Sequence, residues 1–577
     1  MTLNGAHATR NGYDFIPRAP GVPYDCSMGT AVGHAALDAL RGEGLGRDAR
    51  GIELPEAQVV GPRRSRRPTR KAMLADLFYV FGSEARLEPP IDWLQDPQGS
   101  RSWRYELHTL TWLKEALARH ARGGDVETLA IAREIAVDWA RAHLRSDEEQ
   151  SEFAWYDMAV GLRAPYLAYV LRACLAEGML DDEAAELLLE AAERHGAELT
   201  DGRRYAAGNN HGLFQDEGLY LLARLLPSLP AAAAWRELAL VRMRSTLDVT
   251  VSFADGAHLE HSTAYHLAIV DLVARLAANV EELPELGPLL DRMRRTAAWQ
   301  TTPAGRMAQL GDTDDLPAPA WARKAAAPLR GMRVLPEAGQ AFVRDEESYL
   351  AVTAAHHSAA HKHADDCGFL LIEGGRVVLG DAGRWGYYEE EPDRLYARAA
   401  AAHNVLSIDG LDFEWRTAEP YGSGLEAADE DDGWYVIRAR NPLLARQGVE
   451  HSRTFFYRPA AALIVADRVR AESSREYVRR FHFGPELEAE LDGDGAVAIT
   501  GRGIAAKLVE LTAEAKPSLA HGDEEPLVGW TYPCDRERVP VWTATLRSRG
   551  KDATLVAALS LDGDPIEAVP EAIGRHL

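Results

Sequence analysis

Apolar residues recur at helical spacing through the first half of the chain, from about residue 103 to residue 300. Stretches such as VETLAIAREIAVDWARAHL, MAVGLRAPYLAYVLRACLAEG and DDEAAELLLEAAERHGAEL repeat them every three or four residues, which is typical of amphipathic helices. Short Gly, Asp or Pro breaks separate the stretches, so neighbouring helices should pack as antiparallel hairpins. We therefore predict an (α/α) helical toroid over residues 101–335, with residues 1–100 packing on it.

The pattern changes to short strands beyond about residue 340. SYLAVTAA, CGFLLIEGGRVVLGDAG, HNVLSIDG, GWYVIRAR, HSRTFFYR, AALIVADRVR and EYVRRFHFG carry β-branched and aromatic residues between turn signals. Many short strands at this spacing favour an antiparallel β-sandwich, which we assign to residues 336–577. PEAGQAF, from Pro336 to Phe342, is the expected junction. The fold class is thus a multidomain α+β protein.

Composition and charge narrow the class of partner. The 577 residues hold 64 Lys and Arg against 88 Asp and Glu, a net charge of −24, which argues against a nucleic-acid-binding protein. No apolar run reaches membrane-spanning length, and no secretory signal is seen, so we expect no membrane partner and a cytoplasmic location. A secreted or periplasmic location stays open if this sequence is a piece of a longer one.

The four cysteines are far apart, which bears on redox chemistry. Cys26, Cys174, Cys367 and Cys534 form neither a CxxC motif nor a dense framework, and we expect free thiols.

Two helix starts carry polar groups suited to chemistry. In GNNHGLFQDEGLY, Asn210 and His211 begin a predicted helix, where Asn commonly caps free N–H groups. The same geometry would attract a carboxylate. In STAYH, Tyr265 also begins a helix. Amphipathic packing is its usual role, although a tyrosine hydroxyl can also carry a proton.

A third group lies in AAHHSAAHKHADDCGF, where His361 and His363 form an H-x-H pair. On a strand, residues i and i+2 share a face, so the two imidazoles could chelate a metal. Asp381 follows the next expected strand and His403 opens HNVLSIDG. Two His and one Asp with an open position would suit zinc.

Together these stretches resemble the heparinase II/III-like polysaccharide lyases. The resemblance is carried, in order over roughly residues 100 to 560, by NNHGLFQ, STAYH, GDTDD, HKHADD, VVLGDAGRWGY, YARAAAAHNVLSIDG and GVEHSRTFFYR. The pairing of HKHAD with a downstream AHN…DG is the most specific signal, whereas NNHG alone would be weak. The resemblance implies an incomplete (α/α) toroid followed by an antiparallel β-sandwich, in agreement with the hydrophobic pattern.

The resemblance also implies an activity, β-elimination at a uronic acid in a polysaccharide or oligosaccharide. Asn210 and His211 match residues that polarise the uronate carboxylate, and Tyr265 and His361 match the catalytic tyrosine and histidine. Which of the latter two is the base stays open. The remaining residues implied are metal ligands and substrate contacts: His363, Asp381 and His403 for a structural zinc, and Arg163 and Tyr396 for the substrate.

Arg163 and Tyr396 are each as well explained by a structural role, Arg163 as an ion pair on a helix surface. No organic cofactor is expected. A homodimer, the polymer cleaved and endo or exo action stay open.

Two other functions compete with a lyase. A glycoside hydrolase would need a pair of carboxylates. Asp216, Glu217 and Asp312 are available, but nothing marks a pair, and the Asn, His and Tyr set would go unexplained. A non-catalytic glycan-binding protein would usually have lost one of Asn210, His211, Tyr265 and His361, and all four are present. We therefore favour the lyase.

Overall fold

The computed structural model describes residues 29–56, 67–147, 149–493, 495–512 and 515–564, together with residues 566, 570 and 574. The chain divides into two compact units. The first comprises residues 1–58, 63–250 and 272–286, and the second residues 59–62, 251–271 and 287–577. Cys26 lies outside the described residues, and the other three cysteines are free thiols, as predicted.

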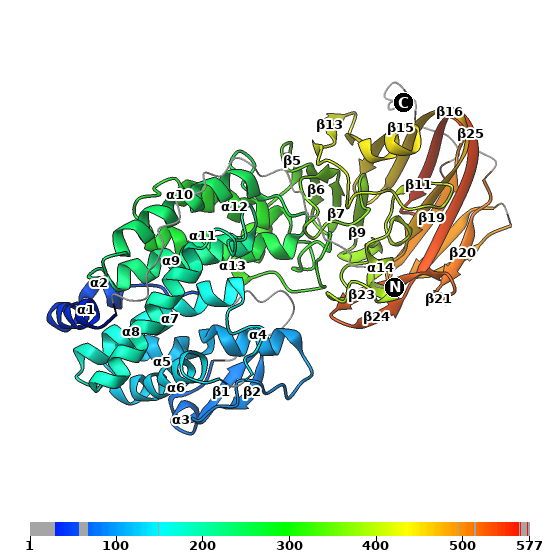
Figure 1. Cartoon of the computed structure of the whole chain (residues 1–577). Helices are drawn as coiled ribbons and strands as arrows, with labels where there is room; N and C mark the ends of the chain where they lie inside the picture. Colours follow the sequence, from blue (N-terminus) through cyan, green and yellow to red (C-terminus); the bar gives the residue numbers. More distant parts are fainter. Residues whose placement is uncertain are drawn as a thin grey trace, which may run out of the picture. The chain divides into compact units, whose positions relative to one another are not determined.

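The first unit is built from helices that pack side by side (Figure 1). Its longer helices follow the predicted stretches closely and begin at side-chain caps such as Asp125, Asp181 and Asn209. The elements are α1 (Gly29–Glu43), α2 (Arg47–Arg50), α3 (Arg70–Met73), β1 (Leu77–Val80), β2 (Ser83–Arg86), α4 (Arg101–Thr109), η1 (Thr111–Leu113), α5 (Lys114–Gly123), α6 (Val126–Leu144), α7 (Asp157–Ala176), α8 (Asp182–Thr200), α9 (Asn210–Leu225) and α10 (Ala232–Thr250).

Helix α7 is the centre of this unit, and its surroundings differ from those expected. The sequence pattern suggested an amphipathic helix, but side chains on every face of α7 are buried. It contacts α8 and α9 closely, and a Cβ added at Gly218 would lie 2.1 Å from the Gly161 carbonyl oxygen. By length and composition alone α7 could cross a membrane, yet its apolar window is entirely buried inside the protein. It is therefore a core helix.

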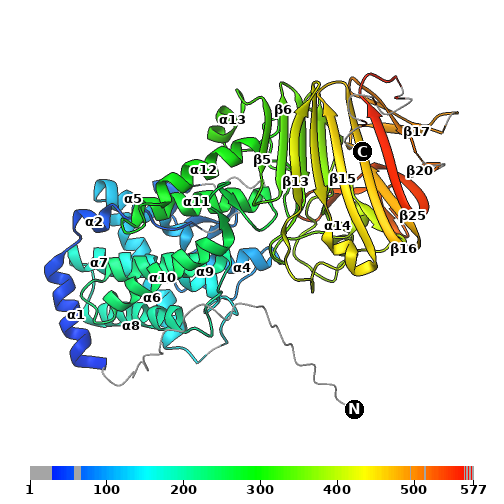
Figure 2. The same cartoon turned by 90° about the horizontal axis from the view of Figure 1, so that it is seen from above.

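The second unit contains two large antiparallel sheets, whose strands run side by side in Figure 2. The five-stranded sheet has the order β10 (Arg376–Leu379), β9 (Gly368–Glu373), β7 (Ser348–Thr353), β6 (Gln340–Asp345), β5 (Gly331–Leu335). The larger sheet runs β13 (Leu425–Asp431), β14 (Trp434–Arg440), β15 (Val449–Arg458), β16 (Ala462–His482), β25 (Trp542–Ser560), β19 (Ile504–Glu510), β18 (Val497–Gly501), β17 (Glu488–Leu491); β11 (Leu406–Ile408) and β20 (Ser518–His521) join β16 and β25.

The remaining elements precede the two sheets in the chain or lie between their strands. They are β3 (Val251–Ser252), β4 (Ala257–His258), α11 (Thr263–Asn279, which continues into the first unit), α12 (Leu286–Trp299), α13 (Ala320–Ala326), β8 (Ala355–His356), α14 (Pro392–Ala397), η2 (Ala400–Ala402), β12 (Gly422–Ser423), η3 (Pro442–Gln447), β21 (Asp523–Glu524), β22 (Leu527–Val528), β23 (Trp530–Cys534) and β24 (Glu537–Pro540).

The two sheets share one apolar core. Val343, Leu350 and Leu371 of the smaller sheet cluster with Phe455 and Val465 of the larger one, which is the packing of a β-sandwich. The other face of the smaller sheet is also covered, because Phe342 and Tyr349 pack with Leu310 and neighbouring segments of this unit. Burial on both faces explains why these strands lack a clear apolar and polar alternation.

The predicted fold class, a helical toroid followed by an antiparallel sandwich, is confirmed. One local expectation differs. AALIVADRVR and EYVRRFHFG form a single strand, β16, with an irregularity between Arg470 and Arg475. Residues 336–339, within the expected junction, form the turn of the hairpin that joins β5 and β6.

Candidate active site and metal centre

The segment with the H-x-H pair lies on a loop between β8 and β9 in the second unit. The expectation that His361 and His363 share the face of a strand is wrong. His361 has a left-handed backbone, with φ at 53°, which cannot belong to a strand and is uncommon for a residue other than glycine. This turn still brings both imidazoles to one carboxylate, although they reach it through different nitrogens.

That carboxylate belongs to Asp312, which is completely buried. Its Oδ2 lies 3.1 Å from His361 Nδ1, and its Oδ1 lies 2.9 Å from His363 Nε2. Arg394 donates to both oxygens. Burial alone would raise the pKa of Asp312, but the hydrogen bonds from both histidines and the charge of Arg394 hold it well below its usual range. Asp312 is therefore an ionised acceptor that serves three partners.

Tyr265 lies in the first turn of α11 and stacks on His361. The ring centroids are 3.5 Å apart and the ring planes differ by 22°. Burial and the neighbouring Tyr387 raise the pKa of Tyr265 well above its ordinary value, so its hydroxyl is protonated near neutral pH. Glu260 lies near the other end of His361, with its Oε2 3.5 Å from Nε2. The two predicted catalytic residues of this unit are thus in direct contact.

Tyr387 is a site residue that sequence analysis missed. Its hydroxyl is 2.5 Å from the Tyr265 hydroxyl, and the guanidinium carbons of Arg384 and Arg394 lie 4.9 and 5.5 Å from its ring centroid. The residue is 44 % exposed, so it can contact a ligand. The sequence signal that could have identified it is the GRWGYY stretch, but nothing in the spacing there distinguishes Tyr387 from Tyr388.

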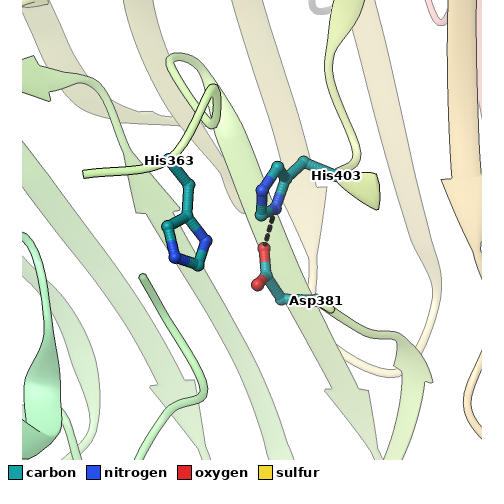
Figure 3. Close-up of side chains that lie close together, drawn as sticks. All are labelled: His363, Asp381 and His403. Atoms are coloured by element: carbon teal, nitrogen blue, oxygen red, sulfur yellow. Dashed lines mark hydrogen bonds and ion pairs between the residues drawn. The ribbon is translucent and has the colours of Figure 1, made fainter. Parts of the chain in front are cut away.

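His363, Asp381 and His403 form a buried group that could hold a metal ion (Figure 3). One ligand atom from each lies within 4.8 Å of the others. His403 Nδ1 is 2.8 Å from Asp381, while His363 Nδ1 and His403 Nε2 are buried without a hydrogen-bond partner in the described residues. Since a buried polar atom without a partner is costly, and two His with one Asp suit zinc, the donor set fits a metal.

Lys362 ties together the loop that carries these histidines. Its ammonium is fully buried and donates to the His363 carbonyl oxygen at 2.6 Å, to Asp365, and to Asp366 at 2.8 Å. Tyr421 donates to the other oxygen of Asp366. A buried cation between two carboxylates is stabilised only while this geometry holds, so the network fixes the conformation of residues 361–366.

Asn210 and His211 belong to the first unit. Asn209, rather than Asn210, caps α9, by accepting from the backbone N–H of His211 at 2.8 Å and of Gly212 at 3.4 Å. His211 Nδ1 lies 3.2 Å from Asp157, and its side chain is one third exposed. The capping function proposed for this stretch is thus performed by Asn209, and the roles of Asn210 and His211 stay a prediction.

The two predicted substrate contacts are both buried. Arg163 is completely inaccessible, with its guanidinium donating to His195 Nε2 and to the carbonyl oxygens of His108 and Ala154. It is therefore a core residue and not an ion pair on a helix surface.

Tyr396 is 6 % exposed and packs in an apolar cluster of the second unit, where its hydroxyl accepts from the Gly529 N–H. These positions favour structural roles for both Arg163 and Tyr396, the alternative that the sequence left open.

The carboxylates available to a hydrolase are all engaged. Glu217 forms a bidentate pair with Arg275 at 3.0 Å. Asp216 is completely buried and accepts from Tyr205, while Asp312 serves the two histidines and Arg394. The structure therefore provides no free pair among these three residues.

Family models match most of the chain. The model described as heparinase II/III N-terminus matches residues 56–290, and the model described as heparinase II/III-like, C-terminal, matches residues 327–550. These matches define a polysaccharide lyase. The chain belongs to the heparinase II/III family.

Comparison with solved structures supports the same fold. A heparan sulfate lyase, HepC, from Pedobacter heparinus aligns at 18% identity with a TM-score of 0.65, covering 92% of this chain and 88% of that one. A heparinase III aligns at 15% identity with a TM-score of 0.66, covering 93% and 86%. A sequence comparison with curated proteins finds no match.

Proposed function

We propose that this chain cleaves uronic-acid-containing polysaccharides or oligosaccharides by β-elimination. The C5–H bond and the C4–O4 bond break, a C4=C5 double bond forms, and the departing O4 takes a proton. The reaction needs a base for the C5 proton and an acid for O4. The observation that carries the proposal is the direct stacking of Tyr265 on His361, since it places two proton-transfer groups side by side.

The hydrogen bonds of the site suggest which of His361 and Tyr265 is the base and which is the acid. Asp312 is an anionic acceptor, so the His361 Nδ1 that faces it carries hydrogen, and Nε2 holds the lone pair in the neutral ring. We assign the acceptance of the C5 proton to His361, where Glu260 would stabilise the resulting imidazolium. Tyr265, which is protonated, then donates to O4.

Substrate charge must also be stabilised. Heparan sulfate is named as the substrate of one structural neighbour, and we propose an anionic glycosaminoglycan-like polymer here. Asn210 and His211 are assigned to the uronate carboxylate, because hydrogen bonds to that group stabilise the charge that develops in the transition state.

A zinc ion at His363, Asp381 and His403 is proposed as a structural component. When bound, it would link the catalytic loop, which carries His363, to the segments that carry Asp381 and His403. Residues 361–366 would then be held by the metal ligand His363 as well as by Lys362. A cytoplasmic location and a homodimer stay predictions.

The test is incubation with a panel of uronic-acid polymers, followed by ultraviolet absorption of the products. We expect an absorbing unsaturated uronate at the new non-reducing end. Saturated sugars with new reducing ends and no such absorption would instead demonstrate hydrolysis and contradict the proposal.

A further inference from the structure

One carboxylate contacts both histidines of the H-x-H pair, although the two are assigned to different tasks. Asp312 accepts from His361 through Oδ2 and from His363 through Oδ1. Neither histidine lies on a helix or strand, so no regular element holds the two rings in line. Asp312 is separated from them by 49 and 51 positions in the chain and therefore supplies a long-range anchor.

Arg394 fixes the charge state and orientation of that anchor. It lies on α14 and donates to both Asp312 oxygens, at 3.0 Å for Nη2 and Oδ2. An arginine stays protonated in proteins, and its fork pairs with a carboxylate in one plane. An ionised carboxylate can only accept, so each imidazole nitrogen that faces Asp312 must carry hydrogen.

This requirement places the lone pair of each neutral imidazole on its other nitrogen. The lone pair of neutral His363 is then on Nδ1, which is buried and has no partner in the described residues. The lone pair of neutral His361 is on Nε2. A metal-ligating histidine typically donates its other N–H to a carboxylate, which fixes the ring and raises its basicity. Asp312 has this relation to His363 and, at the same time, orients the proton acceptor.

We propose that Asp312 is a shared positioning residue that couples occupancy of the metal site to the orientation of His361. This inference rests on the proposed function, and Asp312 itself contacts neither the metal nor the substrate. Loss of the metal would release His363, and the hydrogen bond between His363 and Asp312 would then no longer help Arg394 to hold the carboxylate that orients His361. The metal then influences elimination through a hydrogen bond, without contacting a reacting atom.

A matched control lies two residues along the chain. Asp314 is also buried and forms a bidentate pair with an arginine, Arg384, at 2.9 and 2.7 Å. It contacts neither histidine in the described hydrogen bonds. Asp314→Asn therefore loses a comparable buried ion pair and leaves the Asp312 network intact.

The experiment compares the wild type with Asp312→Asn and Asp314→Asn, using zinc and cobalt as probes. Zinc affinity is measured by competition with a chromophoric chelator, and the visible spectrum of bound cobalt reports ligand geometry. Asp312→Asn should bind zinc about 10–100-fold more weakly, with an altered cobalt spectrum. The kcat of Asp312→Asn should fall while its KM changes little. Removing the metal should lower kcat in the wild type and in Asp314→Asn, but should lower it no further in Asp312→Asn.

A second variant keeps the test valid if Asp312→Asn does not fold. Asp312→Glu keeps the charge beside Arg394 but moves the oxygens by one methylene, so we expect a smaller loss of zinc affinity and kcat in the same direction. Wild-type zinc affinity in Asp312→Asn, or an equal loss in Asp314→Asn, would overturn the proposal. Unchanged kcat in a zinc-deficient Asp312→Asn would overturn the coupling. If no polymer yields an unsaturated product, the elimination fails, while weaker zinc binding still supports the hold of Asp312 on His363.

Discussion

Each unit of this protein buries a cluster of histidines around an arginine, and the two clusters differ in their acids. In the first unit, Arg163 lies 3.9 Å from the Trp139 ring centroid, with His195 at 2.9 Å and His143 stacked on Trp139. Within the described chain, no carboxylate pairs with Arg163. In the second unit, the Arg394 cluster contains Asp312.

This difference separates packing from chemistry. Where carbonyl groups, aromatic faces and a guanidinium surround the rings, neutral imidazoles are favoured, and burial lowers the pKa of His143 to about 4. Where carboxylates face the rings, hydrogen positions are fixed and positive charge can be stabilised. A buried histidine is thus informative about function only once its acidic partners are known.

The largest expected effect concerns Tyr265, and it tests whether the second cluster performs chemistry. Tyr265→Phe keeps the stack on His361 but removes the hydroxyl. Turnover should fall by about 10²–10⁴-fold, the usual contribution of a proton-transfer group, with an unchanged melting temperature. Turnover on the accepted polymer and a melting curve decide the matter, and near-normal turnover would assign Tyr265 to packing.

The proposed metal ion provides the next comparison, now within the second cluster. His363→Ala should lose the ion and melt at a lower temperature, because binding energy at a structural site is folding energy. His361→Ala should keep the ion and lose turnover. Metal analysis of both purified variants separates these outcomes, whereas equal metal loss in the two would indicate a chelating pair.

The pH dependence of stability should distinguish the first cluster from the second. The folded pKa of His143, about 4, lies below its unfolded value of about 6.5. The unfolded chain therefore binds more protons between these values, and stability that is present above pH 6.5 is lost as the pH falls towards 4. The loss is at most about 3 kcal/mol for this residue.

Denaturant unfolding of the wild type and His143→Gln at pH 7 and pH 5 measures this contribution. Other buried histidines titrate in both proteins, so the comparison isolates His143. Identical pH dependence in the two would contradict the assignment.

The smallest effect is expected for Arg163→Lys. Lysine keeps the charge but cannot reproduce the three directed contacts, which leaves a carbonyl group or His195 without a donor and costs about 1–3 kcal/mol. The melting temperature should fall while KM and metal content stay unchanged. A raised KM with normal melting would instead return Arg163 to substrate binding.

The helices and most strands could be predicted because their signals are local. Apolar spacing and caps such as Asp125 define α6 without reference to the rest of the fold. Only part of the candidate site could be predicted from the sequence. His363, Asp381 and His403 were grouped by residue type and resemblance, and they do converge.

The unpredicted features depend on contacts between distant segments or on backbone conformation. The left-handed φ of His361 has no signature in a non-glycine residue. Asp312 appeared as a possible hydrolase acid because its partners lie far along the chain, and Arg163 appeared accessible because burial of α7 on all faces is a property of the packed unit.

The three-way contact of Asp312 has a consequence for anyone who wishes to transplant this site into another scaffold. Grafting the HKHADD loop would carry the histidines but neither the carboxylate that orients them nor the arginine that orients the carboxylate. Those come from Asp312 and from Arg394, 82 positions later. A designer would have to reproduce three separate backbones in register, and a graft of the loop alone should bind metal weakly and leave its histidines free to rotate.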